Sequence, residues 1–351
     1  MVYQGVAVLP DGLELAYADS GPVSGSSNYT TLILVHGCAF NAHTFERLHE
    51  RATTFNLRTI AFQRPDYPGS TPFTDNEIAE IREGNEKYLA NAQKMMVDFI
   101  RYVVKTLEIP VISNLGSVQK GEGISGGLVL VGWSLGAYIP LSVLADPKVV
   151  NPEMHGVLEK YLRSVIVYDS PPMTFGIPIP PANPVAGDPT TAAPKPSDFP
   201  ISITSFFDQP NGWAGDVEAM DRRFAAEKAM WYDWTEEQRN KYVTTSTLMR
   251  CEFPTLVEPM QTHFRNNAQK ALYDETLAQE FLPNISIGVI SVGRSFWHCR
   301  WGIWHMEQTY RAKLNEGKKL RKLKAAHLRE CNHLAHLENP TLFLDTVKSL
   351  I

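Results

Sequence analysis

Short runs of valine, isoleucine and leucine recur along the chain, and stretches with a helical pattern separate most of them. Runs that are apolar throughout, without alternation, are typical of strands buried on both faces of a parallel sheet. Strands are predicted at residues 6–9, 13–18, 32–36, 59–62, 128–132, 165–169, 285–292 and 325–328. The first two flank a Pro-Asp-Gly turn and should pair as an antiparallel hairpin at the sheet edge. The fold class is therefore α/β, a mostly parallel eight-stranded sheet with helices on both faces.

The helical pattern is regular in some places and interrupted in one. Helices are predicted at residues 45–51, 90–107, 135–145, 216–231, 235–249, 259–280 and 341–351. Residues 171–200 contain ten prolines, a density that excludes regular helix and central strand. Strand patterns resume only at residue 285, so the three helices before it indicate a cap inserted after the sixth strand. The predicted domains are a first part of the core at 1–172, a helical cap at 173–283 and a second part of the core at 284–351.

Composition narrows the possible partners. Apolar residues make up 44% and charged residues 20% of the chain, which is the usual composition of a globular protein. The net charge is −5, so no broad basic surface for nucleic acid is expected. No apolar run approaches the roughly 20 residues that span a bilayer, and the first 19 residues do not resemble a signal peptide. The four cysteines are scattered and form no Cys-x-x-Cys pair, which favours reduced thiols and a cytoplasmic location without a membrane partner.

The motif that most strongly indicates catalysis is Gly132-Trp133-Ser134-Leu135-Gly136. It follows a predicted strand and precedes a predicted helix, the context in which a sharp turn exposes the serine hydroxyl and small flanking residues avoid a clash. The alternative is a glycine-rich turn with a passive serine. The strand before and the helix after favour Ser134 as a nucleophile.

A serine hydroxyl needs a base to act as a nucleophile at neutral pH, and that base is normally a histidine. His333 follows the last predicted strand and precedes the final helix, so it should lie at the carboxyl edge of the sheet together with Ser134. His336 is the rival, three residues further on, although it could simply pack against the last helix. We predict His333 as the general base.

Backbone N–H groups are the expected donors to a developing oxyanion. The N–H of Leu135 is one candidate, because it follows the nucleophile at the start of a helix. The second donor should come from the loop at residues 36–39, with the N–H of Cys38 as first choice and that of Ala39 as second. The Cys38 side chain is interpreted as a small buried residue and not as a nucleophile.

These motifs resemble the α/β-hydrolase superfamily, with its His-Gly oxyanion loop, its Gly-x-Ser-x-Gly elbow and a late histidine followed by Leu-Glu-x-Pro. The resemblance covers residues 5–172 and 284–351. Residues 63–70 are also similar to a loop of the superfamily, although Pro65 and Asp66 depart from its pattern. The closest resemblance is to fungal members, which implies a fold and a catalytic apparatus but no substrate.

The resemblance also raises the question of the catalytic acid. Most members carry it just after the strand predicted here at residues 285–292, yet no Asp or Glu occurs from residue 281 to residue 306. Some members, including certain haloalkane dehalogenases and the zearalenone-type lactonases, take it from the end of the preceding strand. Asp169 stands there and is the predicted acid, although it could instead cap a turn before two prolines. Glu307 is the weaker alternative.

Aromatic residues supply candidate substrate contacts. Trp133, beside the nucleophile, and the cap residues Trp213 and Trp231 are predicted to bind substrate, although such residues are more often plain core. His298 and His305 stand seven residues apart without the carboxylate of a zinc-protease helix, so no metal site is predicted.

The expected function is hydrolysis of an ester or lactone of a small, largely apolar molecule, with no metal and no organic cofactor. An epoxide hydrolase or a dehalogenase of this fold would need a carboxylate in place of Ser134. Three alternatives stay open: an acyltransferase, a serine-dependent carbon–carbon bond hydrolase, and a ligand receptor without turnover.

Overall fold

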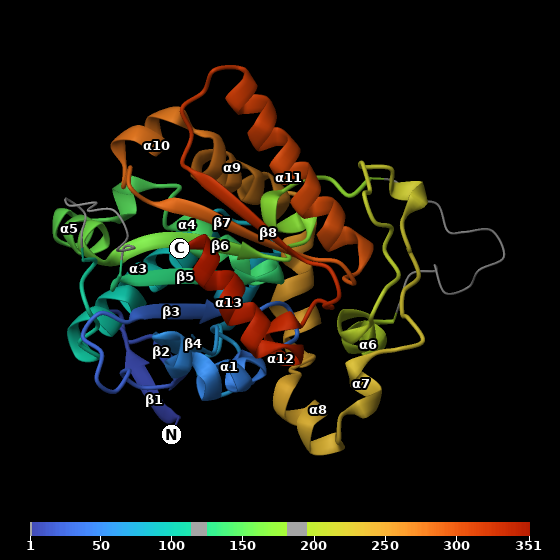
Figure 1. Ribbon diagram of the computed structural model, residues 1–351, viewed down its shortest axis with the longest axis horizontal. Helices are drawn as coiled ribbons and strands as arrows, with labels where there is room; N and C mark the ends of the chain where they lie inside the picture. Colours follow the sequence, from blue (N-terminus) through green and yellow to red (C-terminus); the bar gives the residue numbers. More distant parts are fainter. Residues whose placement is uncertain (1, 114–124, 181–194) are drawn as a thin grey trace.

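The computed structural model describes residues 2–113, 125–180 and 195–351 (Figure 1), so residues 181–194 of the proline-rich stretch lie outside it. Eight strands form one sheet in the order β1-β2-β4-β3-β5-β6-β7-β8. They are β1 (Tyr3–Val8), β2 (Glu14–Asp19), β3 (Thr30–Val35), β4 (Leu57–Phe62), β5 (Leu128–Trp133), β6 (Leu162–Tyr168), β7 (Ser286–Val292) and β8 (Leu323–Leu328). The β1–β2 and β2–β4 pairs are antiparallel and the others are parallel. The predicted mostly parallel sheet with an edge hairpin is confirmed.

Helices cover both faces of this sheet. They are α1 (Glu46–Arg51), α2 (Asp75–Arg82), α3 (Lys87–Thr106), α4 (Tyr138–Ser142), α5 (Pro152–Tyr161), α6 (Phe199–Thr204), α7 (Met230–Asp233), α8 (Glu236–Tyr242), α9 (Met260–Tyr273), α10 (Glu275–Glu280), α11 (Trp297–Asn315), α12 (Ala335–Glu338) and α13 (Pro340–Leu350). Helices α1 and α13 pack together in front of the sheet in Figure 1, whereas α3 contacts α4, which contacts α9. Within the described residues, none of the helices combines the length and apolar composition that crossing a bilayer requires.

The burial of the central strands explains why continuous apolar runs in the sequence predicted them. Every residue of β3, β4 and β5 is buried, so both faces of these strands contact the core. A strand covered on both faces gains stability from apolar side chains at every position, which gives a continuous run in the sequence. The carboxyl ends of β3, β5 and β6 are neighbours in the sheet, so the segments that follow them meet at one edge.

The segment between β6 and β7 contains α6 to α10, and α6, α7 and α8 lie beyond the carboxyl ends of the strands in Figure 1. The helix predicted at residues 216–231 is wrong, because only Val217–Ala219, a turn of 3-10 helix, and the start of α7 are helical. The Phe206 N–H donates to the Lys228 carbonyl over 2.9 Å, and the Asp208 N–H donates to the Asp221 carboxylate over 3.0 Å. Hydrogen bonds to a neighbouring segment thus replace the helical ones.

A buried histidine makes the stability of this fold sensitive to acid. Burial lowers the pKa of His49 from 6.5 to about 4, and its Nδ1 lies 2.8 Å from the Thr59 hydroxyl. Between these two pKa values the unfolded chain binds more protons than the folded protein does. We therefore expect the free energy of unfolding to fall as the pH drops from 6.5 to about 4, with His49 contributing up to about 1.4 kcal/mol per pH unit.

Urea unfolding at pH 7.5, 6 and 5 measures this dependence, and His49→Gln serves as the comparison because it has no titratable group. The difference in free energy between pH 7.5 and pH 5 should be smaller in the variant than in the parent, whatever its absolute stability. Equal differences in the two proteins would exclude His49 as the source.

Candidate active site

Ser134 lies at a sharp turn between β5 and a 3-10 helix, Ser134–Ala137. Its backbone φ is 55°, in the left-handed region that residues other than glycine rarely adopt. A Cβ on Gly132 would lie 2.3 Å from the Ala137 Cα, and one on Gly136 would lie 2.1 Å from the His36 carbonyl oxygen. Both glycines of the motif are therefore required by close backbone contacts. Such a strained turn holds the serine side chain outside the regular pattern of strand and helix.

His333 lies on the loop between β8 and α12, and its ring is buried. Its carbonyl oxygen accepts hydrogen bonds from the Trp133 Nε1 and the Tyr168 hydroxyl, each over 2.9 Å. Since Trp133 and Tyr168 are the paired last residues of β5 and β6, the loop is held against the carboxyl ends of those strands. The imidazole is thus fixed at the edge where Ser134 and Asp169 leave the sheet.

Asp169 follows β6 directly, with a φ of 43°, and is fully buried. Its Oδ2 lies 2.6 Å from the His333 Nδ1, and its Oδ1 accepts a hydrogen bond from the Val292 N–H over 3.2 Å. The His333 Nε2 has no hydrogen-bond partner among the described residues, Ser134 included. The structure therefore pairs Asp169 with His333, and the opposite ring nitrogen is buried without a hydrogen bond from the serine hydroxyl.

The two alternative residues lie elsewhere. The His336 Nδ1 is 3.3 Å from the Tyr168 hydroxyl, and its ring packs against Trp133 and Phe45. Burial lowers the pKa of His336 well below its ordinary value, so this ring is neutral. Glu307 lies on α11 and pairs with Arg311 over 3.7 Å. Neither group shares the geometry of the Asp169–His333 pair.

The loop after β3 lies against the nucleophile. A Cβ on Gly37 would be 2.9 Å from the Ser134 Cβ. The Cys38 N–H donates no hydrogen bond within the described part of the chain, and Leu135 is the second residue of its helix, where N–H groups have no partner inside the helix. The Ala39 N–H, in contrast, donates to the Glu252 carboxylate over 2.9 Å. The two first-choice oxyanion donors are free, and the second choice is occupied.

Glu252 is the residue that the sequence did not indicate. It ends a turn of π-helix, Leu248–Glu252, between β6 and β7, and is 2% exposed. Besides the Ala39 N–H, its carboxylate accepts hydrogen bonds from the Cys38 thiol over 3.1 Å and the Tyr67 hydroxyl over 2.8 Å, and it forms an ion pair with Arg64. The Thr247 hydroxyl also donates to it over 3.2 Å from five residues away. The other four partners are 185 to 214 residues away along the chain, so no local pattern could have predicted them.

This buried cluster fixes the conformation of the oxyanion loop. Arg64 also donates from Nη2 to the Gly37 carbonyl over 2.7 Å, and its backbone N–H donates to the His36 Nε2 over 3.0 Å. Burial raises the pKa of the Cys38 thiol well above its ordinary value, and the Glu252 carboxylate raises it further. The thiol is therefore protonated at neutral pH, in agreement with its interpretation as a packing residue.

Removing Glu252 should destabilise the whole protein. In Glu252→Leu the Arg64 guanidinium would stay buried without its counter-charge, and losing one partner of a buried pair costs about 3 to 5 kcal/mol. Urea unfolding measures this loss. As a control, Glu258→Gln breaks an exposed ion pair with Arg265 and should change the stability little. The double variant Arg64→Met/Glu252→Leu should be more stable than Glu252→Leu alone, and a lower stability would contradict the argument.

The three tryptophans predicted to bind substrate lie in different surroundings. Trp133 is buried in the core, with its ring 5.1 Å from that of His333. Trp213 packs against Trp304 at 5.3 Å, and the Trp231 ring lies under the Arg239 guanidinium at 4.8 Å. Within the described residues, neither Trp213 nor Trp231 makes a ring contact or a hydrogen bond with Ser134 or His333. Their role in binding substrate stays a prediction.

Asp169, His333 and Cys299 are a cluster whose ligand-type atoms lie within 4.8 Å of one another, as a metal site would require. The Asp169 carboxylate and the His333 Nδ1 are already hydrogen-bonded to each other, so a cation there would have to displace that bond. Burial raises the pKa of the Cys299 thiol well above its ordinary value, which disfavours the thiolate that binds metals. The cluster therefore suits a carboxylate–imidazole pair better than a metal.

Comparisons with known proteins were made with the sequence and with the fold. The sequence matches no curated protein. Solved structures with the same fold include a bromoperoxidase from Bacillus anthracis, at 13% identity and a TM-score of 0.50, with 99% of each chain covered. Potato (Solanum tuberosum) epoxide hydrolase I is 12% identical with a TM-score of 0.50, over 99% of this chain and 98% of that one. The N-formylmaleamic acid deformylase from Pseudomonas putida is 13% identical with a TM-score of 0.50, over 98% of this chain and 100% of that one.

At such identities these structures establish the fold alone. The family model is more specific, because the one described as "Alpha/beta hydrolase family" matches residues 32–346, nearly the whole chain. This range includes the turn at Ser134, Asp169 and the loop that carries His333. The chain belongs to the alpha/beta hydrolase family.

Proposed function

We propose that the protein is a serine hydrolase that cleaves a carboxylic ester or lactone of a small, largely apolar molecule. The observation that carries the proposal is the hydrogen bond of 2.6 Å between the Asp169 carboxylate and the His333 Nδ1. A carboxylate on one ring nitrogen places the proton there and leaves the other nitrogen as a base. The His333 Nε2 has no other partner among the described residues, so it is available to a serine hydroxyl.

In the proposed reaction Ser134 Oγ attacks the substrate carbonyl carbon, and its proton moves to the His333 Nε2. The negative charge that develops on the carbonyl oxygen is stabilised by the N–H groups of Cys38 and Leu135. The intermediate collapses to an acyl-enzyme as the alcohol leaves with the proton from His333. A water molecule, which gives a proton to the same histidine, then attacks the carbonyl carbon of the acyl-enzyme, and the bond to Ser134 Oγ breaks as that oxygen takes the proton back and the acid is released. These steps require no metal or organic cofactor, and we place the activity in the cytoplasm, where the four buried free cysteines would stay reduced.

The test combines active-site labelling with a substrate panel. A fluorophosphonate probe should label Ser134 once per chain, and p-nitrophenyl esters and small lactones should be turned over with water as the acceptor. Absence of labelling would contradict the proposal. Turnover that requires an added alcohol or amine would instead indicate an acyltransferase, and binding at one equivalent without turnover would indicate a receptor.

A further inference from the structure

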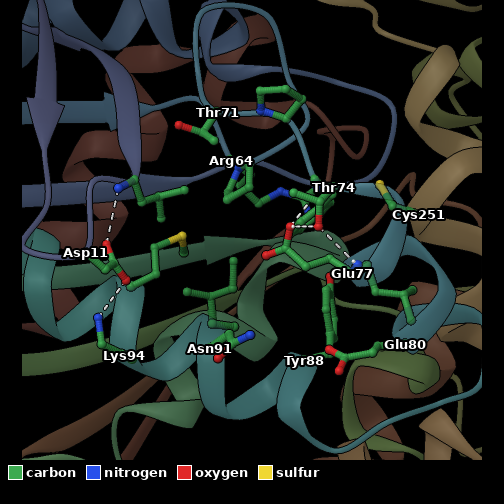
Figure 2. Close-up of a pocket in the computed structure, with 18 of the residues that line it drawn as sticks. Asp11, Arg64, Thr71, Thr74, Glu77, Glu80, Tyr88, Asn91, Lys94 and Cys251 are labelled. Atoms are coloured by element: carbon green, nitrogen blue, oxygen red, sulfur yellow. Dashed lines mark hydrogen bonds and ion pairs between the residues drawn. The ribbon is translucent and has the colours of Figure 1, made fainter.

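A cavity of about 390 Å³ lies at the same edge of the sheet as Ser134 but does not include it (Figure 2). Its lining comes from the turn between β1 and β2, the loop after β4, helices α2, α3 and α4, and Cys251 of the π-helix turn. Neither Ser134 nor His333 is among the residues that line it. The volume is within the range of small-molecule sites, which is about 300 to 1,000 Å³.

The walls of this cavity are mainly apolar and aromatic. Phe73, Ile81, Met95 and Ile139 contribute side chains to it. Tyr88 and Tyr138 also line it, and their hydroxyls are hydrogen-bonded to each other over 2.6 Å. Such walls favour an aromatic or alicyclic ligand over a strongly hydrated one.

The acidic side chains at the cavity already have partners. Asp11 pairs with Lys94 over 2.7 Å, and Glu80 pairs with Lys87 over 2.7 Å. Glu77 accepts hydrogen bonds from Thr74, which caps α2. Figure 2 shows the contacts of Asp11 with Lys94 and of Glu77 with Thr74 at the cavity. With three carboxylates and only Arg64 and Lys94 as cations in the lining, the charges disfavour an anionic ligand.

Arg64 provides a donor inside the cavity. It is 4% exposed, and its Nη2 donates to the Gly37 carbonyl and the Tyr67 hydroxyl and pairs with the Glu252 carboxylate. The Arg64 Nη1, in contrast, makes no hydrogen bond within the described part of the chain. Because Arg64 is one of the residues that line the cavity, its Nη1 is a guanidinium nitrogen that is left for a ligand there. Because Glu252 already balances the charge, a neutral acceptor suits this donor better than a carboxylate.

We infer that this cavity is a second binding site, for a neutral, mainly aromatic or alicyclic molecule with one carbonyl-type oxygen that accepts a hydrogen bond from the Arg64 Nη1. The site is separate from Ser134, because neither the oxyanion loop nor Ser134 nor His333 contributes to the lining, and the cavity is connected to that loop through the buried contacts of Tyr67 and Arg64 with Glu252. The inference does not depend on the reaction proposed for Ser134. An occupant would contact the arginine that also holds the Gly37 carbonyl.

The neutral aryl ketone 6-propionyl-2-dimethylaminonaphthalene is a suitable probe, because its fluorescence reports transfer into an apolar site. It should bind the full-length protein at one equivalent, with a Kd on the order of 100 µM or tighter. The analogue with a propyl group in place of the propionyl group should bind about 10 to 100 times more weakly, since a hydrogen bond to a charged donor is lost. The 6-carboxylate analogue should also bind more weakly, and tighter binding of that anion would overturn the assigned ligand class.

A matched pair of variants tests whether the probe binds in this cavity. Asn91 on α3 is exposed at the cavity and is labelled in Figure 2, whereas its neighbour Ala90 is exposed but not part of the lining. Asn91→Trp should weaken binding of the ketone at least about tenfold by filling the cavity, while Ala90→Trp and Ser134→Ala should leave the Kd unchanged. Equal binding by both tryptophan variants, or loss of binding in Ser134→Ala, would overturn the inference. If Asn91→Trp does not fold, Leu13→Trp, on the hairpin turn, makes the same test.

Discussion

Replacing Ser134 with alanine should abolish fluorophosphonate labelling and reduce kcat for any ester or lactone substrate by about a millionfold, the size of effect expected when the nucleophile of a catalytic triad is removed. The turn that carries Ser134 is fixed by close backbone contacts at Gly132 and Gly136, so the alanine variant should keep the fold. Intact-mass spectrometry after labelling and initial rates on p-nitrophenyl acetate measure the two effects.

Ser142 is a matched control for this experiment. It is also buried and lies on α4, eight positions after Ser134, with its hydroxyl donating to the Ile139 carbonyl over 2.7 Å. Ser142→Ala should retain labelling and turnover. Labelling of Ser134→Ala at the rate of the parent would remove Ser134 from the mechanism and leave the site without a nucleophile.

Asp169→Asn should lower kcat by about ten thousandfold, as expected when a triad acid is replaced by its amide. The asparagine Oδ1 can still accept from the Val292 N–H, which places the amide NH2 next to the His333 Nδ1. An NH2 group donates, so Nδ1 must become the acceptor and the ring proton moves to Nε2. The histidine then has no lone pair directed at the serine hydroxyl, although its position is unchanged. The melting temperature should change little in comparison with kcat.

Glu307→Gln is the control for the acid, because Glu307 is the other carboxylate considered and it pairs with Arg311 instead of the imidazole. This variant should keep kcat within about twofold of the parent, because Glu307 makes no hydrogen bond or ion pair with Ser134, Asp169 or His333 within the described residues. If Asp169→Asn lost less than tenfold while Glu307→Gln lost more, the acid would have to be reassigned.

The sheet could be predicted because the buried parallel strands have a recognisable pattern in the sequence. Each residue of β3, β4 and β5 contacts the core, so each strand is a continuous apolar run. The apolar pattern of residues 216–231 wrongly predicted a helix, because this segment instead forms hydrogen bonds with residues 206–209. Helix α2 was missed even though Thr74 and Glu77 form a capping box, a signal that can be read from the sequence.

In the candidate site, features that depend on neighbouring residues could be predicted, whereas contacts between segments far apart in the chain could not. The turn at Ser134 is local, because glycine is required within two residues on either side. Asp169 was predicted from the resemblance to family members that carry the acid after the preceding strand, because no Asp or Glu occurs from residue 281 to residue 306. The contact between Glu252 and the Ala39 N–H could not be predicted, since it depends on how a segment between β6 and β7 folds back onto the loop after β3.

Three adjacent strands, β3, β5 and β6, are followed by Ala39, Ser134 and Asp169, which are all non-glycine residues with a positive φ, of 60°, 55° and 43°. Each such residue stores on the order of 1 to 3 kcal/mol of backbone strain. A selection for heat resistance alone would therefore favour glycine at these positions, and at Ser134 and Asp169 the gain in stability would remove the side chain proposed for catalysis. A thermostable variant of this chain is better sought on the outer surface of α3 or α13 than along this edge.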